Sequence, residues 1–432
     1  MKRRGLRVLL VGGGGREHAL AWKLAQSPRV AKLYAAPGNA GMAGLATCLA
    51  IGATDLDGLV RAAREIEADL TVVGPDDPLA QGLVDRLQAD GLAAFGPTAA
   101  AARIESSKAF AKALMRRAGI PTGRHEVFDE PERAARHISA YFAENPSEPV
   151  VLKADGLALG KGVVITPSES EALAAAREML SGRAFGEAGR RIVVEEYLQG
   201  PEVSALAFTD GRHVLPMVGS RDHKRAFDGD QGPNTGGMGT ITPVPGYGPE
   251  LAEEVHRRVL EPAVAALAES GAPFVGVLYA GLILTRSGPK VLEFNARFGD
   301  PEAQVLARRL DSDLVDVLEA CVGGGLSPDA ATWGREAAAC VVMASGGYPG
   351  PYQKGVPITG VAEAESLEGV VVFHAGTARD DSGRLVTAGG RVLGVSATGA
   401  DLGAALDQAY AAAERIDFAG AHYRHDIGRT RL

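Results

Sequence analysis

The first hundred residues alternate between short apolar runs and segments of helical character, and no other feature constrains the fold as strongly. The apolar runs have the length of strands and lie at 6–11, 32–37, 69–74 and 93–96. The helices expected between them cover 17–27, 55–68 and 79–90. Asp55 is a good N-cap for the second of these helices. Alternation of this kind predicts a parallel sheet with helices on both faces.

The rest of the chain predicts further domains, because 432 residues are too many for one ordinary core. A helix over 106–118 leads into a small α+β pattern, and antiparallel hairpins with a long helix over 249–269 follow. The predicted domains cover 1–104, 105–123 together with 193–330, 124–192, and 331–432. The expected fold class is α/β in the N-terminal domain and α+β in the rest, including a small C-terminal α+β domain.

Charge and cysteine content exclude several classes of protein. The formal net charge is −8, which argues against binding to nucleic acid or to an anionic membrane. No apolar stretch reaches the roughly 18 to 20 residues of a membrane span. Cys48, Cys321 and Cys340 are far apart, so neither a disulfide framework nor a zinc site is expected. A cytoplasmic protein that acts on small molecules fits these observations, and so does a monomer.

A glycine-rich turn, Gly12 to Gly15, joins the first apolar run to its helix. A dinucleotide fingerprint needs a third glycine and, about 20 residues later, an acidic ribose ligand. The third position is Glu17, and the second strand ends in Ala35, Ala36 and Pro37. These departures argue against a dinucleotide. The remaining backbone N–H groups at a helix N-terminus suit a single phosphate, and a tight turn without a ligand is the alternative.

Two later stretches have features of a nucleotide site. In KADGLALGKG (153–162), glycines would let the backbone close over phosphates, which Lys153 and Lys161 would neutralise. This loop is not a Walker A loop. It resembles the mobile lid of the ATP-grasp ligases, and a flexible hairpin is the alternative. In VVEEYLQGPE (193–202), backbone groups at Glu196 and Leu198 could bind an adenine edge and Glu202 a ribose. An ordinary strand end with solvated acids is the alternative there.

A predicted strand near residue 293 carries a candidate metal site. Glu293 and Asn295 alternate with apolar residues, so both side chains point to one face. Two oxygen donors beside a phosphate site are what Mg²⁺ needs. Arg297 shares that face and could hold a carboxylate or a forming acyl phosphate. The loop 220–239 groups Asp222, His223, Lys224 and Arg225, which indicates a substrate clamp or else a solvated loop.

The order of the motifs is more specific than any one of them. After the opening loop come ESSKAF (105–110), KADGLALGKG, EEYL (195–198), DHKR (222–225), GPNTGGMG (232–239), LYAGL (278–282), EFNARFGDPE (293–302) and ASGGYPG (344–350). Together, over essentially the whole chain, they resemble the glycinamide ribonucleotide synthetases. The resemblance implies an N-terminal α/β domain, an ATP-grasp core with a small lid domain, and a C-terminal domain.

The resemblance also implies a reaction of purine biosynthesis. ATP, glycine and 5-phosphoribosylamine would give ADP, phosphate and glycinamide ribonucleotide, with Mg²⁺ or Mn²⁺ as the metal. Phosphorylation of glycine's carboxylate would give an acyl phosphate that the amine can attack. The protein would then have to position groups and neutralise charge, without a nucleophile of its own.

Residue by residue, the resemblance implies four sets of residues. ATP would be bound by Lys108, Lys153, Gly160, Lys161, Gly162, Glu195, Glu196, Leu198 and Glu202, and the metal by Glu293 and Asn295. The catalytic residues would be Asp222, Lys224 and Arg297. The other substrates would be bound by Gly13, Gly14, Gly15, Arg16, Asn39, Asp76, Asp222 and Arg297. The 5-phosphate is expected against the amides of Gly13 to Arg16.

Two positions depart from the family pattern, and three alternatives stay open. Leu159 replaces a small residue of the lid, and Asp76 replaces a glutamate near the sugar site. The same chemistry could serve another amine and another acid, or bicarbonate. The chain could also be an inactive ATP-binding scaffold, although Glu293 and Lys153 are present, or a nicotinamide dehydrogenase, against which the opening loop argues.

Overall fold

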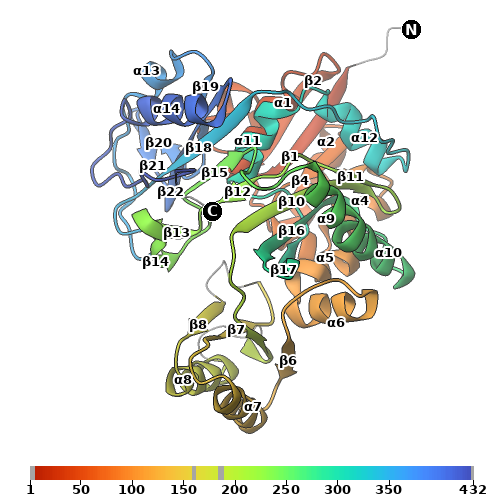
Figure 1. Cartoon of the computed structure of the whole chain (residues 1–432). Helices are drawn as coiled ribbons and strands as arrows, with labels where there is room; N and C mark the ends of the chain where they lie inside the picture. The colour runs from red at the N-terminus through yellow and green to blue at the C-terminus, as the bar shows by residue number, and fades with distance from the viewer. Residues whose placement is uncertain (1–4, 158–161, 183–188, 430–432) are drawn as a thin grey trace.

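Five parallel strands form the N-terminal sheet, which confirms the fold expected from the alternation. The computed structural model describes residues 5–157, 162–182 and 189–429 (Figure 1). The sheet order is β3-β2-β1-β4-β5. Its strands are β1 (Leu6–Gly12), β2 (Val30–Pro37), β3 (Thr47–Cys48), β4 (Leu70–Val73) and β5 (Ala94–Phe95). Along β1, Leu9 and Val11 belong to one buried cluster and Val8 and Leu10 to another, so both faces of the sheet are covered.

The helices of this unit agree with the prediction except at one break and at α5, which was not predicted. They are α1 (Gly15–Leu24), α2 (Leu56–Glu65), α3 (Asp76–Ala80), α4 (Leu83–Ala89), α5 (Ala99–Ser106) and α6 (Lys108–Ala118). Asp55 caps α2 by accepting a hydrogen bond from the Gly58 N–H at 2.9 Å, as expected. The single helix predicted over 79–90 is wrong. Gly82 has a φ of +85° and separates α3 from α4.

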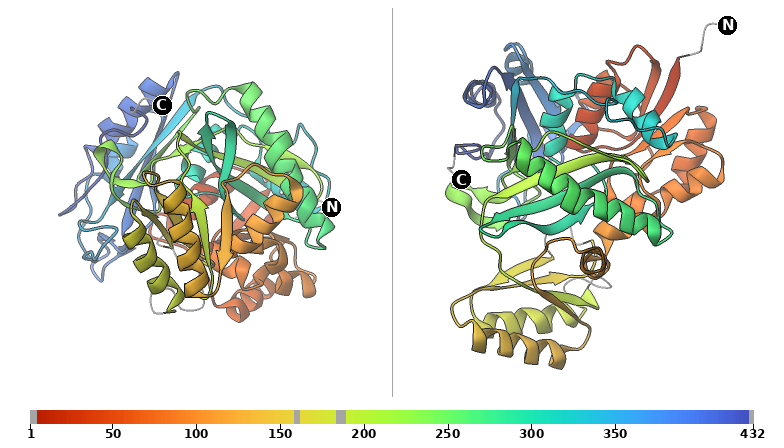
Figure 2. Two further views of the ribbon diagram at one scale, coloured as in Figure 1. Left: turned by 60° about the horizontal axis from the view of Figure 1, so that its bottom comes forward. Right: turned by 45° about the vertical axis from the view of Figure 1, so that its right-hand side comes forward.

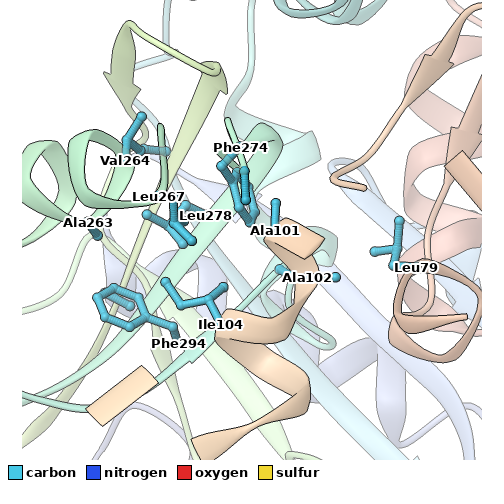
Figure 3. Close-up of a cluster of buried hydrophobic side chains, with 14 of the residues drawn as sticks. Leu79, Ala101, Ala102, Ile104, Ala263, Val264, Leu267, Phe274, Leu278 and Phe294 are labelled. Carbon is cyan, nitrogen blue, oxygen red and sulfur yellow. The ribbon is translucent and has the colours of Figure 1, made fainter. Parts of the chain in front are cut away.

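Helix α5 was not predicted, and it joins the N-terminal unit to the central one. Its side chains Ala101, Ala102 and Ile104 lie among residues of both units (Figure 3). The side chains that surround them include Leu79, Ala263, Val264, Leu267, Phe274, Leu278 and Phe294. One continuous core therefore holds the two units together.

A small antiparallel sheet projects from the rest of the molecule (Figures 1 and 2). Its order is β6-β9-β7-β8. The elements are β6 (His125–Phe128), α7 (Pro131–Glu144), β7 (Val150–Ala154), β8 (Val163–Thr166), α8 (Glu169–Leu180) and β9 (Ile192–Glu196). Both helices pack on the face of the sheet that points away from the main body. The predicted boundary at residue 192 falls on the first residue of β9, so this inserted unit extends to Glu196.

The central unit contains the predicted antiparallel hairpins. Its sheet order is β11-β10-β16-β17. The strands are β10 (Glu202–Asp210), β11 (Val214–Pro216), β16 (Val275–Thr285) and β17 (Gly288–Asn295). The long helix expected over 249–269 is present as α9 (Pro249–Val255), a π-helical turn (His256–Leu260) and α10 (Glu261–Glu269). Helices α11 (Glu302–Arg309) and α12 (Leu314–Val322) follow β17.

The C-terminal unit contains strands from two parts of the chain. Its sheet order is β12-β15-β18-β22-β19. The elements are β12 (Arg221–Asp222), β15 (Gly239–Thr242), β18 (Ala337–Ala344), α13 (Val361–Glu365), β19 (Val370–His374), β20 (Thr377–Arg379), β21 (Leu385–Thr387), β22 (Arg391–Gly399) and α14 (Leu402–Ala413). The prediction placed 220–239 in the central domain, but β12 and β15 extend the C-terminal sheet. Between them lies the hairpin of β13 (Arg225–Phe227) and β14 (Gln231–Asn234). Among the described residues, no helix is long and apolar enough to cross a membrane.

Candidate active site

A cavity of about 490 Å³ lies where the four units meet. Most of the predicted site residues that the structure describes line it. They are Arg16, Asp76, Lys108, Lys153, Gly162, Asp222, Lys224, Glu293, Asn295 and Arg297. Glu202 lines a small adjoining cavity beside Asp222, Lys224 and Glu293. Leu159, Gly160 and Lys161 lie outside the described residues.

Glu293 is an acidic residue that lines the cavity. It lies on β17 with Asn295, and both side chains line the cavity, as their alternation predicts. Burial alone would raise the pKa of the Glu293 carboxyl, but the positive charges of Lys224, Lys153 and Lys108 hold it below its ordinary value. An ionised carboxylate and an amide oxygen therefore face the cavity together.

Arg297 is held in place by a glutamate that the sequence analysis did not select. Its Nη2 lies 2.9 Å from Glu105 Oε1 and donates to Asn295 Oδ1 at 3.2 Å. The other oxygen of Glu105 accepts from the Ala296 N–H at 2.7 Å. Glu105 stands at the end of α5, within the motif ESSKAF, from which only Lys108 was selected. Its place in that motif was the signal that could have identified it.

Glu195 does not line the cavity and instead anchors two lysines. Its carboxylate lies 2.7 Å from Lys153 Nζ and accepts a hydrogen bond from Lys112 Nζ. The Glu195 side chain is 2% exposed, so the predicted direct contact with adenosine is replaced by an internal ion pair. Lys112 was not selected, although it follows Lys108 by one helical turn on α6. Burial, with the nearby charge of Lys153, lowers the pKa of Lys112 to about 8.

Glu196 is also held by ion pairs. Its carboxylate lies 2.8 Å from Arg124 Nε and 3.1 Å from Lys290 Nζ. Its backbone N–H donates to the Arg124 carbonyl at 2.9 Å. The expectation of free backbone groups at Glu196 therefore does not hold for its N–H, because that donor joins β9 to the residue before β6. Leu198 is not among the described residues that line the cavity.

The opening glycine loop packs around Glu17. Glu17 Oε2 accepts a hydrogen bond from the Gly14 N–H at 2.7 Å. A Cβ atom on Gly12 would lie 2.5 Å from Glu17 Cγ, and one on Gly74 would lie 2.3 Å from Glu17 Oε1. The expectation that the amides from Gly13 to Arg16 are all open to a phosphate is therefore wrong at Gly14. Gly12 and Gly74 leave space for the side chain of Glu17, which stands where a dinucleotide fingerprint would have its third glycine.

Asn39 holds this loop from the other side. Its Nδ2 donates to the carbonyl oxygens of Gly13 and His374, at 2.9 and 2.8 Å. Its Oδ1 accepts from the N–H groups of Gly41 and Met42, both at 3.0 Å. These bonds use both donors and the acceptor of the amide. The structure therefore gives Asn39 a structural role in place of the predicted substrate contact.

Arg16 is the residue of this loop whose side chain reaches the cavity. Its Nε lies 2.8 Å from Glu17 Oε1, and its Nη1 donates to the Phe298 carbonyl at 2.7 Å. Gly15 packs against α11, because a Cβ atom there would lie 2.6 Å from Gln304 Nε2. Asp76, at the first position of α3, lines the same cavity.

Asp222 has the properties of a proton acceptor. Its Oδ2 lies 3.4 Å from Lys224 Nζ, while its Oδ1 is buried and has no hydrogen-bond partner within the part of the chain that the structure describes. Burial raises the pKa of Asp222 to about 7, against the lowering effect of Lys224. The nearby Glu302 adds to the rise and is itself held by Tyr279 and Ser204, whose hydroxyls lie 2.6 and 2.9 Å from its Oε1. A carboxyl group that ionises near neutral pH suits general base catalysis.

Three family models match the chain in succession. The N domain of phosphoribosylglycinamide synthetase matches residues 6–105, its ATP-grasp (A) domain residues 106–303, and its C domain residues 338–430. These ranges agree with the resemblance found from the motifs.

Known proteins agree with the family models. The phosphoribosylamine–glycine ligase of Phenylobacterium zucineum is 52% identical over 98% of this chain and 99% of its own length. The trifunctional purine biosynthetic protein adenosine-3 of Gallus gallus is 50% identical over 98% of this chain and 42% of its own. The crystal structure of phosphoribosylamine–glycine ligase from Thermotoga maritima has a TM-score of 0.86 and 35% identity, covering 98% and 100% of the two chains.

A biotin carboxylase domain from Hydrogenobacter thermophilus shares the fold alone, with a TM-score of 0.74 and 18% identity over 98% of this chain and 92% of that one. The family models together span nearly the whole sequence, and the relatives are about half identical to it. The chain therefore belongs to the phosphoribosylglycinamide synthetase family.

Proposed function

We propose that the chain joins glycine to 5-phosphoribosylamine at the expense of ATP, by way of glycyl phosphate, in purine biosynthesis. The observation that carries this proposal is the meeting of Glu293, Asn295, Lys153 and Arg297 at one cavity. Lys153 and Arg297 would neutralise phosphate and carboxylate oxygens, and Glu293 and Asn295 would supply oxygen ligands to a metal. We further propose that the chain acts in the cytoplasm.

The two steps of the reaction explain this set of residues. A carboxylate does not react with an amine at neutral pH, so an oxygen of glycine first attacks the γ-phosphorus of ATP, and ADP leaves. The amine of phosphoribosylamine then attacks the carbonyl carbon of glycyl phosphate. Inorganic phosphate leaves with the C–O bond electrons, and the amine gives up a proton. The protein contributes positioning and charge stabilisation.

ATP is proposed to lie between the inserted and central units. Lys108 and Lys153 would contact its phosphates, and Glu195, which also pairs with Lys112, holds Lys153 in place. Leu198 and Glu202 remain the proposed contacts of the adenosine. The loop of Gly160, Lys161 and Gly162 remains the proposed cover over the phosphates, which would keep water from glycyl phosphate.

The donor set fits Mg²⁺ or Mn²⁺ bound together with ATP. Glu293 and Asn295 offer oxygen atoms only, and no group of three or more His, Cys, Asp or Glu side chains suited to a metal occurs among the described residues. Mg²⁺ commonly takes one or two protein oxygens and completes its shell with phosphates and water. The cation would neutralise and orient the phosphates when bound.

The amine substrate is proposed to lie toward the N-terminal unit. Arg16 and the amides of Gly15 and Arg16 would hold its 5-phosphate. Asp76 would accept hydrogen bonds from the ribose. Arg297 would bind the glycine carboxylate and later the acyl phosphate, because a guanidinium matches both groups.

An omission assay tests the proposed reaction. Phosphate release should require ATP, glycine and freshly prepared phosphoribosylamine together. Release that continues without glycine would contradict the proposal. Replacement of glycine by other small acids, or of phosphoribosylamine by other amines, tests the alternative that the site serves different substrates.

Glu105→Gln is expected to raise the KM for glycine about tenfold, with little change in the KM for ATP. The variant keeps the shape of the side chain but removes the charge opposite Arg297, so the guanidinium is less firmly held. Hydrogen bonds to charged groups contribute about 1.5–3 kcal/mol, or roughly 10- to 100-fold. Initial rates with each substrate varied in turn measure the effect. Glu319→Gln, at a surface pair with Arg29, is the matched control, and equal KM values for both variants would contradict the assignment.

A further inference from the structure

Arg424, close to the C-terminal end of the chain, has a side chain that is 0% exposed. Its Nε and Nη2 donate to the two oxygens of Asp426, both at 2.8 Å. Its Nη1 donates to Asp230 Oδ1 at 2.8 Å and to the Arg225 carbonyl at 3.1 Å. All three nitrogens of the guanidinium are therefore used, and two of the acceptors belong to the β13–β14 hairpin about 200 residues earlier.

The neighbours of Arg424 in sequence hold the same hairpin. The C-terminal segment, residues 422–428, makes further contacts with residues 223–230. The Gly229 N–H donates to Asp426 Oδ2 at 2.8 Å, and the His425 N–H donates to Asp228 Oδ1 at 2.8 Å. Figure 1 shows the hairpin as a two-stranded ribbon beside the C-terminal sheet. The C-terminal segment is thus hydrogen-bonded to the turn of the hairpin.

The base of the hairpin forms part of the active-site wall. Lys224 precedes β13, Asn234 ends β14, and both line the cavity together with Thr235 and Gly236. The N–H and the hydroxyl of Thr235 both donate to the Lys224 carbonyl, at 2.8 Å each. The two ends of the hairpin are therefore tied to each other, and a movement of its turn would be transmitted to Lys224.

The Gly236 end of this wall lies toward the opening loop, to which the amine substrate is assigned. Arg391 donates to the Gly236 carbonyl at 2.7 Å and pairs with Asp300 at 3.1 Å. Asp300 in turn lies against the opening loop, because a Cβ atom on Gly15 would lie 3.3 Å from its Oδ1. The lysines assigned to ATP come instead from α6 and β7.

We propose that Arg424 is a positioning residue, through which the C-terminal segment holds the hairpin in the conformation that binds phosphoribosylamine. The inference rests on the proposed function. Loss of the guanidinium would leave the carboxylates of Asp230 and Asp426 without their shared partner and would free the turn. The base of the hairpin would then sample conformations that do not bind the substrate. The apparent affinity for phosphoribosylamine would fall in proportion to the fraction of molecules that remain in the binding conformation.

The test compares Arg424→Met with Arg429→Met in the full chain. Arg429 belongs to the same end of the chain but is half-exposed and pairs with Asp407 on the surface at 3.0 Å. Arg424→Met is expected to raise the KM for phosphoribosylamine at least tenfold while kcat and the KM for ATP change less than twofold. Arg429→Met should leave all of these values unchanged.

A second variant covers the case in which Arg424→Met fails to fold. Asp230 is half-exposed and has a φ of +54°, a conformation that asparagine tolerates well. Asp230→Asn keeps the shape and removes the charge, and it is expected to raise the same KM about threefold. An unchanged KM in folded Asp230→Asn, or an equal loss in kcat and in every KM, overturns the proposal.

Hydrogen exchange separates this inference from the proposed function. Amides of residues 225–234 should exchange at least tenfold faster in Arg424→Met or Asp230→Asn than in the unaltered protein, with no change in the inserted unit. A wild-type protein without ligase activity would refute the proposed function. Unchanged hydrogen exchange in the hairpin would refute the proposed positioning role of Arg424, whatever the ligase activity of the variants.

Discussion

Glu293→Ala is expected to lower the rate of ligation at least 100-fold while the protein stays folded. Glu293 is an ionised group at the cavity, surrounded by Lys108, Lys153 and Lys224. With alanine there, the proposed metal keeps only the neutral Asn295 as a protein ligand. Loss of one preorganised electrostatic contact to a reacting group costs about 10²- to 10³-fold in rate.

The variant should separate catalysis from nucleotide binding. Removal of the carboxylate leaves the three lysines without their shared counter-charge, so ATP without metal should bind at least as tightly as in the unaltered protein. Phosphate release over a range of Mg²⁺ concentrations gives the rate, and calorimetry without metal gives the affinity. Glu319→Ala is the control. Full activity of Glu293→Ala would show that the metal is not held by this side chain.

Local signals in the sequence were enough to predict most of the fold. Asp55 caps α2 as its side chain allows, and the apolar residues of β1 pack on both faces because the strand is flanked by helices. Failures occurred where one residue or a distant partner decides the outcome. Gly82 breaks a predicted helix through its positive φ. Strands β12 and β15 join a sheet whose three other strands all come from the chain after residue 336, a distant pairing that no local signal indicates.

The sequence allowed prediction of the residues that face the cavity, but not of the residues that form ion pairs with other site residues. Glu293 and Asn295 follow from strand alternation alone. Glu195 and Glu105 have no local feature that distinguishes an internal ion pair from a ligand contact. Their roles depend on Lys153 and Arg297, whose positions only the fold supplies.

The rate of ligation is expected to depend on the ionisation of Asp222. Burial raises the pKa of this carboxyl group to about 7, so the group is protonated below that pH and able to accept a proton above it. The rate at saturating substrates should therefore rise with pH through about 7 and then level off. The buried Oδ1, which has no partner among the described residues, is the atom proposed to take the proton of the attacking amine.

Asp222→Asn should lower kcat about 10²- to 10⁴-fold, which is the usual contribution of a general base, and should remove the rise near pH 7. Asp407→Asn, on the exposed surface, is the control.

The order of the two steps allows a sharper test. In the proposed reaction glycyl phosphate forms before the amine attacks, so Asp222→Asn should still form it from ATP and glycine. Hydroxylamine, a strong nucleophile that does not depend on a protein base, would trap the glycyl group as a hydroxamate. If the variant loses hydroxamate formation as completely as ligation, Asp222 acts in the phosphoryl step or in holding Lys224. If only ligation is lost, the proton of the amine goes to Asp222.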